Sequence, residues 1–166
     1  MLQLTPEQLK RMTTHAERAY PEECCGLLIG RRQRRETLER KQLVEVWATL
    51  NAWSAEVEAE LADMARPPQP DRRVGKVDRY WIDPKEILKA QRYARDHQLD
   101  IIGIYHSHPD HPSVPSECDR SLAWSQYTYI IVSVQHGTAQ EIQGWSLDES
   151  HQFQPEKIVT VDSILA

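Results

Sequence analysis

Residues 101–120 read IIGIYHSHPDHPSVPSECDR, a short apolar run that passes directly into a dense polar cluster. The run DIIGIY predicts a short strand in the centre of a sheet. Side chains two residues apart on a strand point to the same side, so His106 and His108 are expected to project together, roughly 6–7 Å apart along the chain. Three prolines stiffen the loop that follows: Pro109, Pro112 and Pro115. The fold must therefore bring a central strand end and a stiff polar loop to one place.

Capping patterns predict helices over residues 5–20, from Asp83 through ILKAQRYARDHQ, and from Ser116 to about Ser125. Apolar runs predict the strands CCGLLIGRR, LVEVWATLN, RYWIDP, DIIGIY, YTYIIVSVQ, AQEIQGWSL and HQFQPEKIVTV. The first two strands are expected to pair as antiparallel neighbours. Because helices and strands mix without a strict βαβ order, we predict an α+β (α/β-layered) domain with a mixed sheet.

The length of 166 residues fits one domain, residues 1–166, which is long enough to bury a core. Residues 54–78 break the compact pattern, because they begin as an acidic, Ala-rich helix former and turn into a Pro- and Arg-rich linker. We predict that they are an insertion. It is either a solvated, mobile loop or a flap near the site that contacts a partner.

Composition argues against several classes of protein. The three cysteines, Cys24, Cys25 and Cys118, are an odd number with an adjacent pair, which does not suit a secreted disulfide framework. The amino-terminal residues are charged and amphipathic, and no apolar run approaches membrane-spanning length. The formal net charge of −5 gives no basic face for nucleic acid. We expect a soluble, unprocessed, cytoplasmic protein that binds neither membranes nor nucleic acid.

A metal ion is one explanation of the paired histidines. Catalytic zinc takes three protein ligands and leaves a fourth position for water, and Asp119 is the candidate third ligand beside His106 and His108. A His-x-His pair alone is also common as structural or surface chemistry. Asp110 and His111 are rival ligands, but they follow His108 in a tight loop and are expected to lie outside the ligand set.

Ser116 and Asp119 have a second interpretation, because Ser-x-x-Asp at a helix start is an N-terminal capping pattern. The two interpretations are compatible, since a helix that begins at Ser116 presents Asp119 from its first turn, toward the histidines. Cys118 is expected to pack, with adventitious metal binding as the alternative. Cys24 and Cys25 are expected to be small buried strand residues.

The combined pattern is His106-Ser107-His108, seven residues, then Ser116-x-x-Asp119. It resembles the JAMM signature of the MPN family of zinc metalloproteases at every position. That family places an essential glutamate on an early strand, and Glu23 in YPEECCGLLIG fills this position, with Glu22 one residue out of register. The resemblance covers most of the chain and implies the MPN/JAMM (cytidine-deaminase-like) fold, with a largely antiparallel sheet flanked by helices.

The resemblance also implies roles for these residues. Zinc held by His106, His108 and Asp119 would lower the pKa of its bound water from near 16 toward roughly 7. Glu23 would take the proton of this water and pass it to the leaving amine, although an ordinary exposed glutamate is the alternative. Ser116 would donate a hydrogen bond to the oxyanion, with capping as its alternative.

The function implied by the resemblance is hydrolysis of a peptide or isopeptide bond after the Gly-Gly tail of a ubiquitin-like or sulfur-carrier protein. A glycine pair has no side chains, so an extended tail can enter a narrow groove beside a sheet edge. The alternatives are a non-catalytic MPN scaffold or interaction domain, and a peptidase or amidase of broader specificity.

Overall fold

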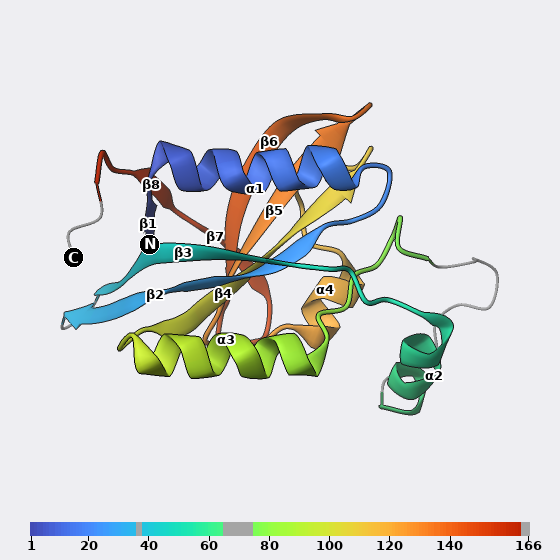
Figure 1. Cartoon of the computed structure of the whole chain (residues 1–166), viewed down its shortest axis with the longest axis horizontal. Coiled ribbons are helices and arrows are strands. Elements are labelled where there is room, and N and C mark those ends of the chain that lie inside the picture. The colour runs from blue at the N-terminus through green and yellow to red at the C-terminus, as the bar shows by residue number, and fades with distance from the viewer. Residues whose placement is uncertain (36–37, 65–74, 164–166) are drawn as a thin grey trace.

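The computed structural model describes residues 1–35, 38–64 and 75–163, which form one large sheet with helices on its two faces (Figure 1). The elements in chain order are β1 (Leu2–Leu4), α1 (Pro6–Ala19), β2 (Cys25–Arg35), β3 (Leu38–Thr49), α2 (Ala55–Met64), α3 (Pro84–Asp96), β4 (Asp100–Pro109), α4 (Glu117–Leu122), β5 (Thr128–Gln135), β6 (Thr138–Leu147), β7 (Phe153–Glu156) and β8 (Ile158–Thr160).

The sheet has the strand order β7-β6-β5-β4-β2-β3-β1-β8. The pairs β2/β3, β2/β4, β5/β6 and β6/β7 are antiparallel, whereas β4/β5, β1/β3 and β1/β8 are parallel. The predicted mixed, largely antiparallel α+β fold is therefore confirmed. Strand β4 lies inside the sheet between β2 and β5, which confirms the predicted central position, and the chain that connects β4 to its parallel neighbour β5 carries α4.

Helices α1 and α3 cover opposite faces of the sheet (Figure 1). Helix α1 begins with the predicted capping box, in which Thr5 and Gln8 exchange side-chain to backbone hydrogen bonds. It buries Met12 and Ala16 in one apolar core, while α3 buries Ala90 and Ala94 in the other. None of the described helices is long and apolar enough to cross a membrane.

Two strand predictions are wrong. RYWIDP pairs with no strand, because the backbone N–H of Trp81 donates to the Asn51 side chain and its carbonyl accepts from Ala52. HQFQPEKIVTV forms two strands, β7 and β8, on opposite edges of the sheet. The single residue between them, Lys157, has its carbonyl bound by Leu2 of β1, a strand that the sequence patterns missed. The predicted helix from Ser116 is also shorter than expected, since α4 ends at Leu122.

The predicted insertion, residues 54–78, begins with α2, which lies at one side of the molecule, away from the sheet (Figure 1). Residues 65–74 lie outside the described part of the chain. The chain is described again from Gly75, beside the start of β2, where Glu23 N–H donates to the Lys76 carbonyl at 2.7 Å. That these residues are an insertion into a single domain stays a prediction.

Candidate metal centre

The carboxyl end of β4 carries His106 and His108 on one side of the sheet. His106 has no exposed surface and His108 is 8% exposed. Their Nε2 atoms face each other at 3.0 Å, and their ring centroids lie 4.9 Å apart. Alternation along a central strand therefore directs both imidazoles into one buried space, as the spacing predicted.

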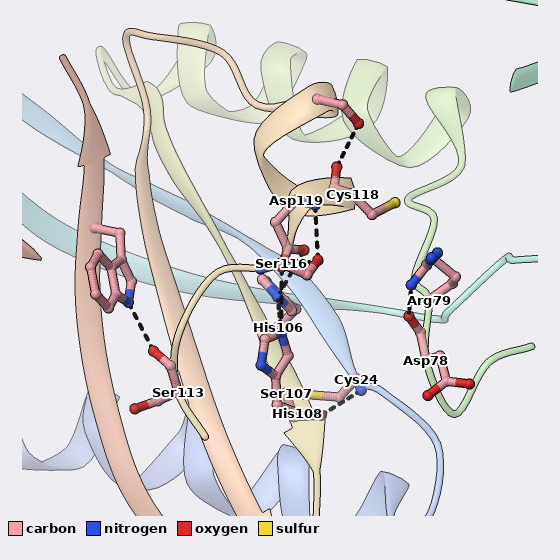
Figure 2. Close-up of polar contacts among 12 residues, drawn as sticks. Cys24, Asp78, Arg79, His106, Ser107, His108, Ser113, Ser116, Cys118 and Asp119 are labelled. Atoms are coloured by element: carbon pink, nitrogen blue, oxygen red, sulfur yellow. Dashed lines mark hydrogen bonds and ion pairs between the residues drawn. The ribbon is translucent and has the colours of Figure 1, made fainter. Parts of the chain in front are cut away.

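Asp119 reaches the same space from the first turn of α4 (Figure 2). Its Oδ1 lies 3.2 Å from His106 Nε2, and its Oδ2 lies 3.5 Å from His108 Nε2. Tetrahedral zinc with bonds near 2.1 Å would separate its ligand atoms by about 3.4 Å. The three observed separations bracket this value, so these residues fit a zinc ion.

Hydrogen bonding fixes the tautomer of His108. Its Nδ1 lies 2.8 Å from the carbonyl oxygen of Pro112, which can only accept, so Nδ1 carries the proton and Nε2 keeps its lone pair. This is the form that binds a metal through Nε2. His106 differs, because its Nδ1 has no polar partner among the described residues. Its ring instead stacks on Tyr80, with centroids 4.5 Å apart.

The charges of the three candidate ligands depend on one another. Burial alone would raise the pKa of Asp119, but the adjacent His106 and His108 imidazoles hold it well below its usual range. Burial lowers the pKa of His106, against the opposing effect of Asp119. An ionised carboxylate beside a neutral imidazole is the protonation state that a divalent cation needs.

Ser116 has the capping role that the sequence left open. Its hydroxyl donates to Asp119 Oδ2 at 2.7 Å and accepts from Asp119 N–H at 3.1 Å. Its own N–H also donates to Oδ2, at 2.6 Å. These bonds orient the Asp119 carboxylate toward the histidines. The capping role is confirmed, and the role toward an oxyanion stays a prediction.

Glu23 lies just before β2 and is 7% exposed, whereas Glu22 is exposed. Burial, followed by the negative charge of Asp119, raises the pKa of Glu23 to about 9, against the opposing charge of Arg79. The alternative of an ordinary exposed glutamate is therefore wrong. Cys25, two residues after Glu23, pairs with His106 across β2 and β4, so Glu23 lies near the candidate centre.

The rival ligands lie elsewhere. Asp110 is exposed and accepts hydrogen bonds from the Tyr20 hydroxyl and the His136 N–H, both at 2.8 Å. His111 is exposed as well, and the group that contacts the fold is its carbonyl, which accepts from Ser133 at 2.7 Å. Neither residue belongs to the group that could hold a metal.

The cysteines do not belong to that group either. Cys24 and Cys25 are buried in opposite cores of the sheet, as predicted for small strand residues. Cys118 is partly buried, and Figure 2 shows its sulfur on the side of Asp119 that faces Arg79. Burial raises the pKa of the Cys118 thiol, which disfavours the thiolate that a metal would need.

The sequence patterns missed three groups that support the candidate metal centre: the Tyr80 ring, the Pro112 carbonyl and the Asn51 side chain. Tyr80 and Asn51 contact the site only through long-range packing and hydrogen bonds. No spacing rule could have identified them. The loop prolines hinted at a stiff loop but not at its carbonyl as the partner of His108.

Fold and site together define a mixed α+β domain with a candidate centre of two histidines and an aspartate at the end of its central strand. The sequence profile of the prokaryotic homologs of the JAB domain matches residues 5–148, and the chain belongs to this family. The resemblance to the JAMM/MPN family is thus confirmed.

Curated relatives share shorter segments with this chain. A desampylase of Haloferax volcanii is 47% identical over 58 residues, which are 32% of this chain and 40% of the relative. A desampylase of Pyrococcus furiosus is 32% identical over 81 residues, or 48% and 55% of the two chains. A Thermus thermophilus protein named a probable TtuB-protein conjugate cleaving protease is 34% identical over 64 residues, or 39% and 43%. The chain spans about half the length of these relatives.

Solved structures match over nearly the whole chain. A protein of Desulfitobacterium hafniense has a TM-score of 0.72 and 25% identity, and the match covers 99% of this chain and 95% of that protein. A protein of Salinibacter ruber has a TM-score of 0.62 and 31% identity, with 98% and 92% covered. These matches confirm the fold class.

Proposed function

We propose that the protein is a zinc-dependent hydrolase that cleaves a peptide or isopeptide bond after the Gly-Gly tail of a ubiquitin-like or sulfur-carrier protein. One observation carries the proposal: His106, His108 and Asp119 converge at zinc-ligand separations, and a buried glutamate, Glu23, lies two residues before Cys25, the strand partner of His106. The names of the three relatives, two desampylases and a conjugate cleaving protease, support it.

A bound zinc ion would supply an activated water, polarise the scissile carbonyl and favour the ionised form of a nearby carboxyl. The residues of this chain would do the rest. Glu23 would accept a proton from the attacking water and deliver it to the leaving amine. The buried position of Glu23 would keep bulk water from competing for that proton.

Ser116 would stabilise the oxyanion that develops on the scissile carbonyl. Its hydroxyl proton now points to Asp119 Oδ2, which also accepts from the Ser116 N–H. The backbone bond can keep Asp119 in place while the hydroxyl turns toward substrate. Capping and catalysis can therefore share this serine.

A Gly-Gly tail suits this arrangement because a glycine pair presents only backbone. An extended tail can lie beside a sheet edge and bring its last carbonyl to a centre at the end of a strand. The proposal includes the predicted insertion, residues 54–78, as a flap beside the bound tail; its residues 65–74 lie outside the described part of the chain. A cytoplasmic location accords with the free cysteines Cys24, Cys25 and Cys118.

The test is cleavage of a Gly-Gly-tailed carrier fused to a cysteine or a peptide, with an Ala-Ala tail as the matched control. We expect cleavage after Gly-Gly only, and its loss when zinc is chelated. Equal cleavage of both tails would contradict the carrier proposal and favour a broader peptidase. A purified protein that contains no zinc and cleaves neither tail would favour the alternative of a non-catalytic scaffold domain.

A further inference from the structure

The side chain of Asn51, just beyond the end of β3, joins three segments of the chain. Its Nδ2 donates to the carbonyl oxygens of Glu23 at 3.0 Å and Arg79 at 2.9 Å. Its Oδ1 accepts from the backbone N–H groups of Trp53 at 3.0 Å and Trp81 at 3.2 Å. Carbonyls only accept and N–H groups only donate, so these partners fix the orientation of the amide. Both donors and both acceptor positions of the side chain are used.

Two backbone hydrogen bonds extend this connection. The Glu23 N–H donates to the Lys76 carbonyl at 2.7 Å, and the Ala52 N–H donates to the Trp81 carbonyl at 2.9 Å. Residues 76–81 therefore lie along both the start of β2 and the end of β3. We call this stretch the covering segment. The Asn51 side chain bonds to both the start of β2 and the covering segment. The thiol of Cys25 in β2 adds longer contacts to the carbonyls of Leu50 at 3.7 Å and Trp81 at 4.0 Å.

Both groups that Asn51 holds by its Nδ2 lie next to residues of the candidate centre. One is the backbone of Glu23, whose carboxyl is the proposed proton carrier and is 7% exposed. The other is the Arg79 carbonyl, which together with the bound Trp81 N–H flanks Tyr80. Tyr80 in turn stacks on His106. A displacement of the Asn51 side chain would therefore move both Glu23 and Tyr80, whose ring stacks on His106.

We propose that Asn51 is a positioning residue. It holds the Glu23 carboxyl at the candidate centre, and it holds the covering segment against the candidate centre. The inference rests on the proposed function, since Glu23 is the proton carrier only in that reaction. Displacing a catalytic group by about 1 Å costs on the order of 100-fold in rate. Loss of the Asn51 bonds should therefore lower kcat much more than it changes KM.

The chain offers a matched control in Gln8. This amide is also buried, and its Nε2 donates to the carbonyls of Leu43 and Val44 at 3.0 and 3.1 Å. Its Oε1 accepts from the Thr5 N–H at 2.8 Å. Asn51→Asp and Gln8→Glu make the same chemical change, because each replaces the donor nitrogen by an oxygen facing two carbonyls. Only Asn51 contacts the segments of the candidate centre.

The experiment compares wild type, Asn51→Asp and Gln8→Glu as full-length, zinc-loaded proteins. Hydrogen exchange without substrate should be at least about 10-fold faster in Asn51→Asp for peptides that contain Glu23 and residues 76–81, and unchanged there in Gln8→Glu. With a Gly-Gly-tailed carrier, kcat of Asn51→Asp should fall by about 10- to 100-fold while KM stays within about threefold. The zinc content of all three proteins should be equal. If Asn51→Asp fails to fold, Asn51→Ala takes its place in the same comparison.

Two results would overturn the proposal. Exchange of the covering segment at the wild-type rate in Asn51→Asp would show that the side chain does not hold it. A kcat of Asn51→Asp equal to that of Gln8→Glu would show that Asn51 acts on stability alone. Failure of the proposed function is distinguishable, because it is seen in the wild-type protein as absence of cleavage, whereas the exchange comparison needs no substrate.

Discussion

The ring of Tyr80 stacks on the ring of His106, with centroids 4.5 Å apart and planes inclined by 26°. His106 is fully buried, and no described residue bonds to its Nδ1. Beyond its Nε2 contacts with the other candidate ligands, this imidazole is therefore held by packing, whereas the ring of His108 is also held by its bond to the Pro112 carbonyl. Two neighbouring ligands of one candidate centre are thus fixed by two different means.

Replacing Tyr80 by alanine should weaken zinc binding by about 10- to 100-fold, the range typical when the support of a metal ligand is lost. Tyr80→Phe keeps the stacked ring, and it should bind zinc within about twofold of wild type because the contact that the described residues show between Tyr80 and His106 is made by the ring. Competition with a chelator of known affinity measures both variants. Equal affinities for the two variants would show that the ring does not support His106.

Metal analysis tests the ligand set directly. Wild type should bind one zinc per chain, and His108→Ala should lose it because only two ligands remain. His111→Ala is the matched control, since His111 lies three residues away, is exposed and stands outside the candidate group. Stoichiometric zinc in His108→Ala would contradict the assignment.

Local sequence signals predicted much of the fold. The capping box at Thr5 and the cap at Asp83 depend on side chains within three residues of each other, and both formed as predicted. RYWIDP failed because its backbone groups are satisfied by Asn51 and Ala52, far away in the sequence. β1 is three residues long, which is too short to show a period.

In the candidate centre too, sequence predicts what is local and misses what depends on long-range contacts. His106, His108 and Asp119 are close in sequence, so spacing alone could bring them together. Tyr80, Asn51 and the Pro112 carbonyl join the site through tertiary packing that no local pattern records. Sequence therefore predicts the candidate ligands more readily than the residues that hold them in place.

A buried ion pair that the sequence did not predict should contribute strongly to stability. Lys41 of β3 lies 3.6 Å from Glu156 of β7 and donates to the Thr128 hydroxyl at 2.9 Å, and the Lys41 and Glu156 side chains are 4% and 7% exposed. Glu156 also pairs with the amino-terminal ammonium of Met1 at 2.9 Å and accepts from the Thr128 hydroxyl, so Lys41→Met would not leave it bare. The variant would remove one of its two cations and the hydrogen bond from Lys41 to Thr128, and the free energy of unfolding should fall by about 1–3 kcal/mol.

The matched control for Lys41 is Arg11, whose pair with Glu45 is much more exposed, with side chains 51% and 33% accessible. Arg11→Met should lower the free energy of unfolding by less than about 1 kcal/mol. Urea unfolding of both variants gives the comparison. Similar losses would contradict the special role of the buried pair.

Glu23→Gln should keep the zinc and the fold but lower kcat by about 10²- to 10⁴-fold, because an amide cannot accept a proton from the attacking water. Glu22→Gln should leave kcat unchanged, since Glu22 is exposed and one residue out of register. Steady-state kinetics and metal analysis on both variants decide this. The reverse order of effects would place the proton carrier at Glu22.

The same glutamate should also give the metal-free protein a distinctive dependence of stability on pH. The pKa of Glu23 rises from 4.5 to about 9 in the fold, chiefly through burial. Between these values the folded state holds a proton that the unfolded state has released. Stability should therefore fall as pH rises through this window, by up to about 1.4 kcal/mol per pH unit.

Glu23→Gln has no proton to lose at this position, so its free energy of unfolding should fall less steeply than that of wild type between pH 5 and about 9. Urea unfolding with a chelator present, at several pH values, measures both slopes. Glu22→Gln should follow wild type, because its carboxyl is exposed in the folded and the unfolded state. If the free energy of unfolding fell equally steeply with pH in wild type and Glu23→Gln, the Glu23 carboxyl would not be buried in the metal-free fold. A difference that widens toward high pH would support a buried carboxyl that becomes a base only when a cation is bound beside it.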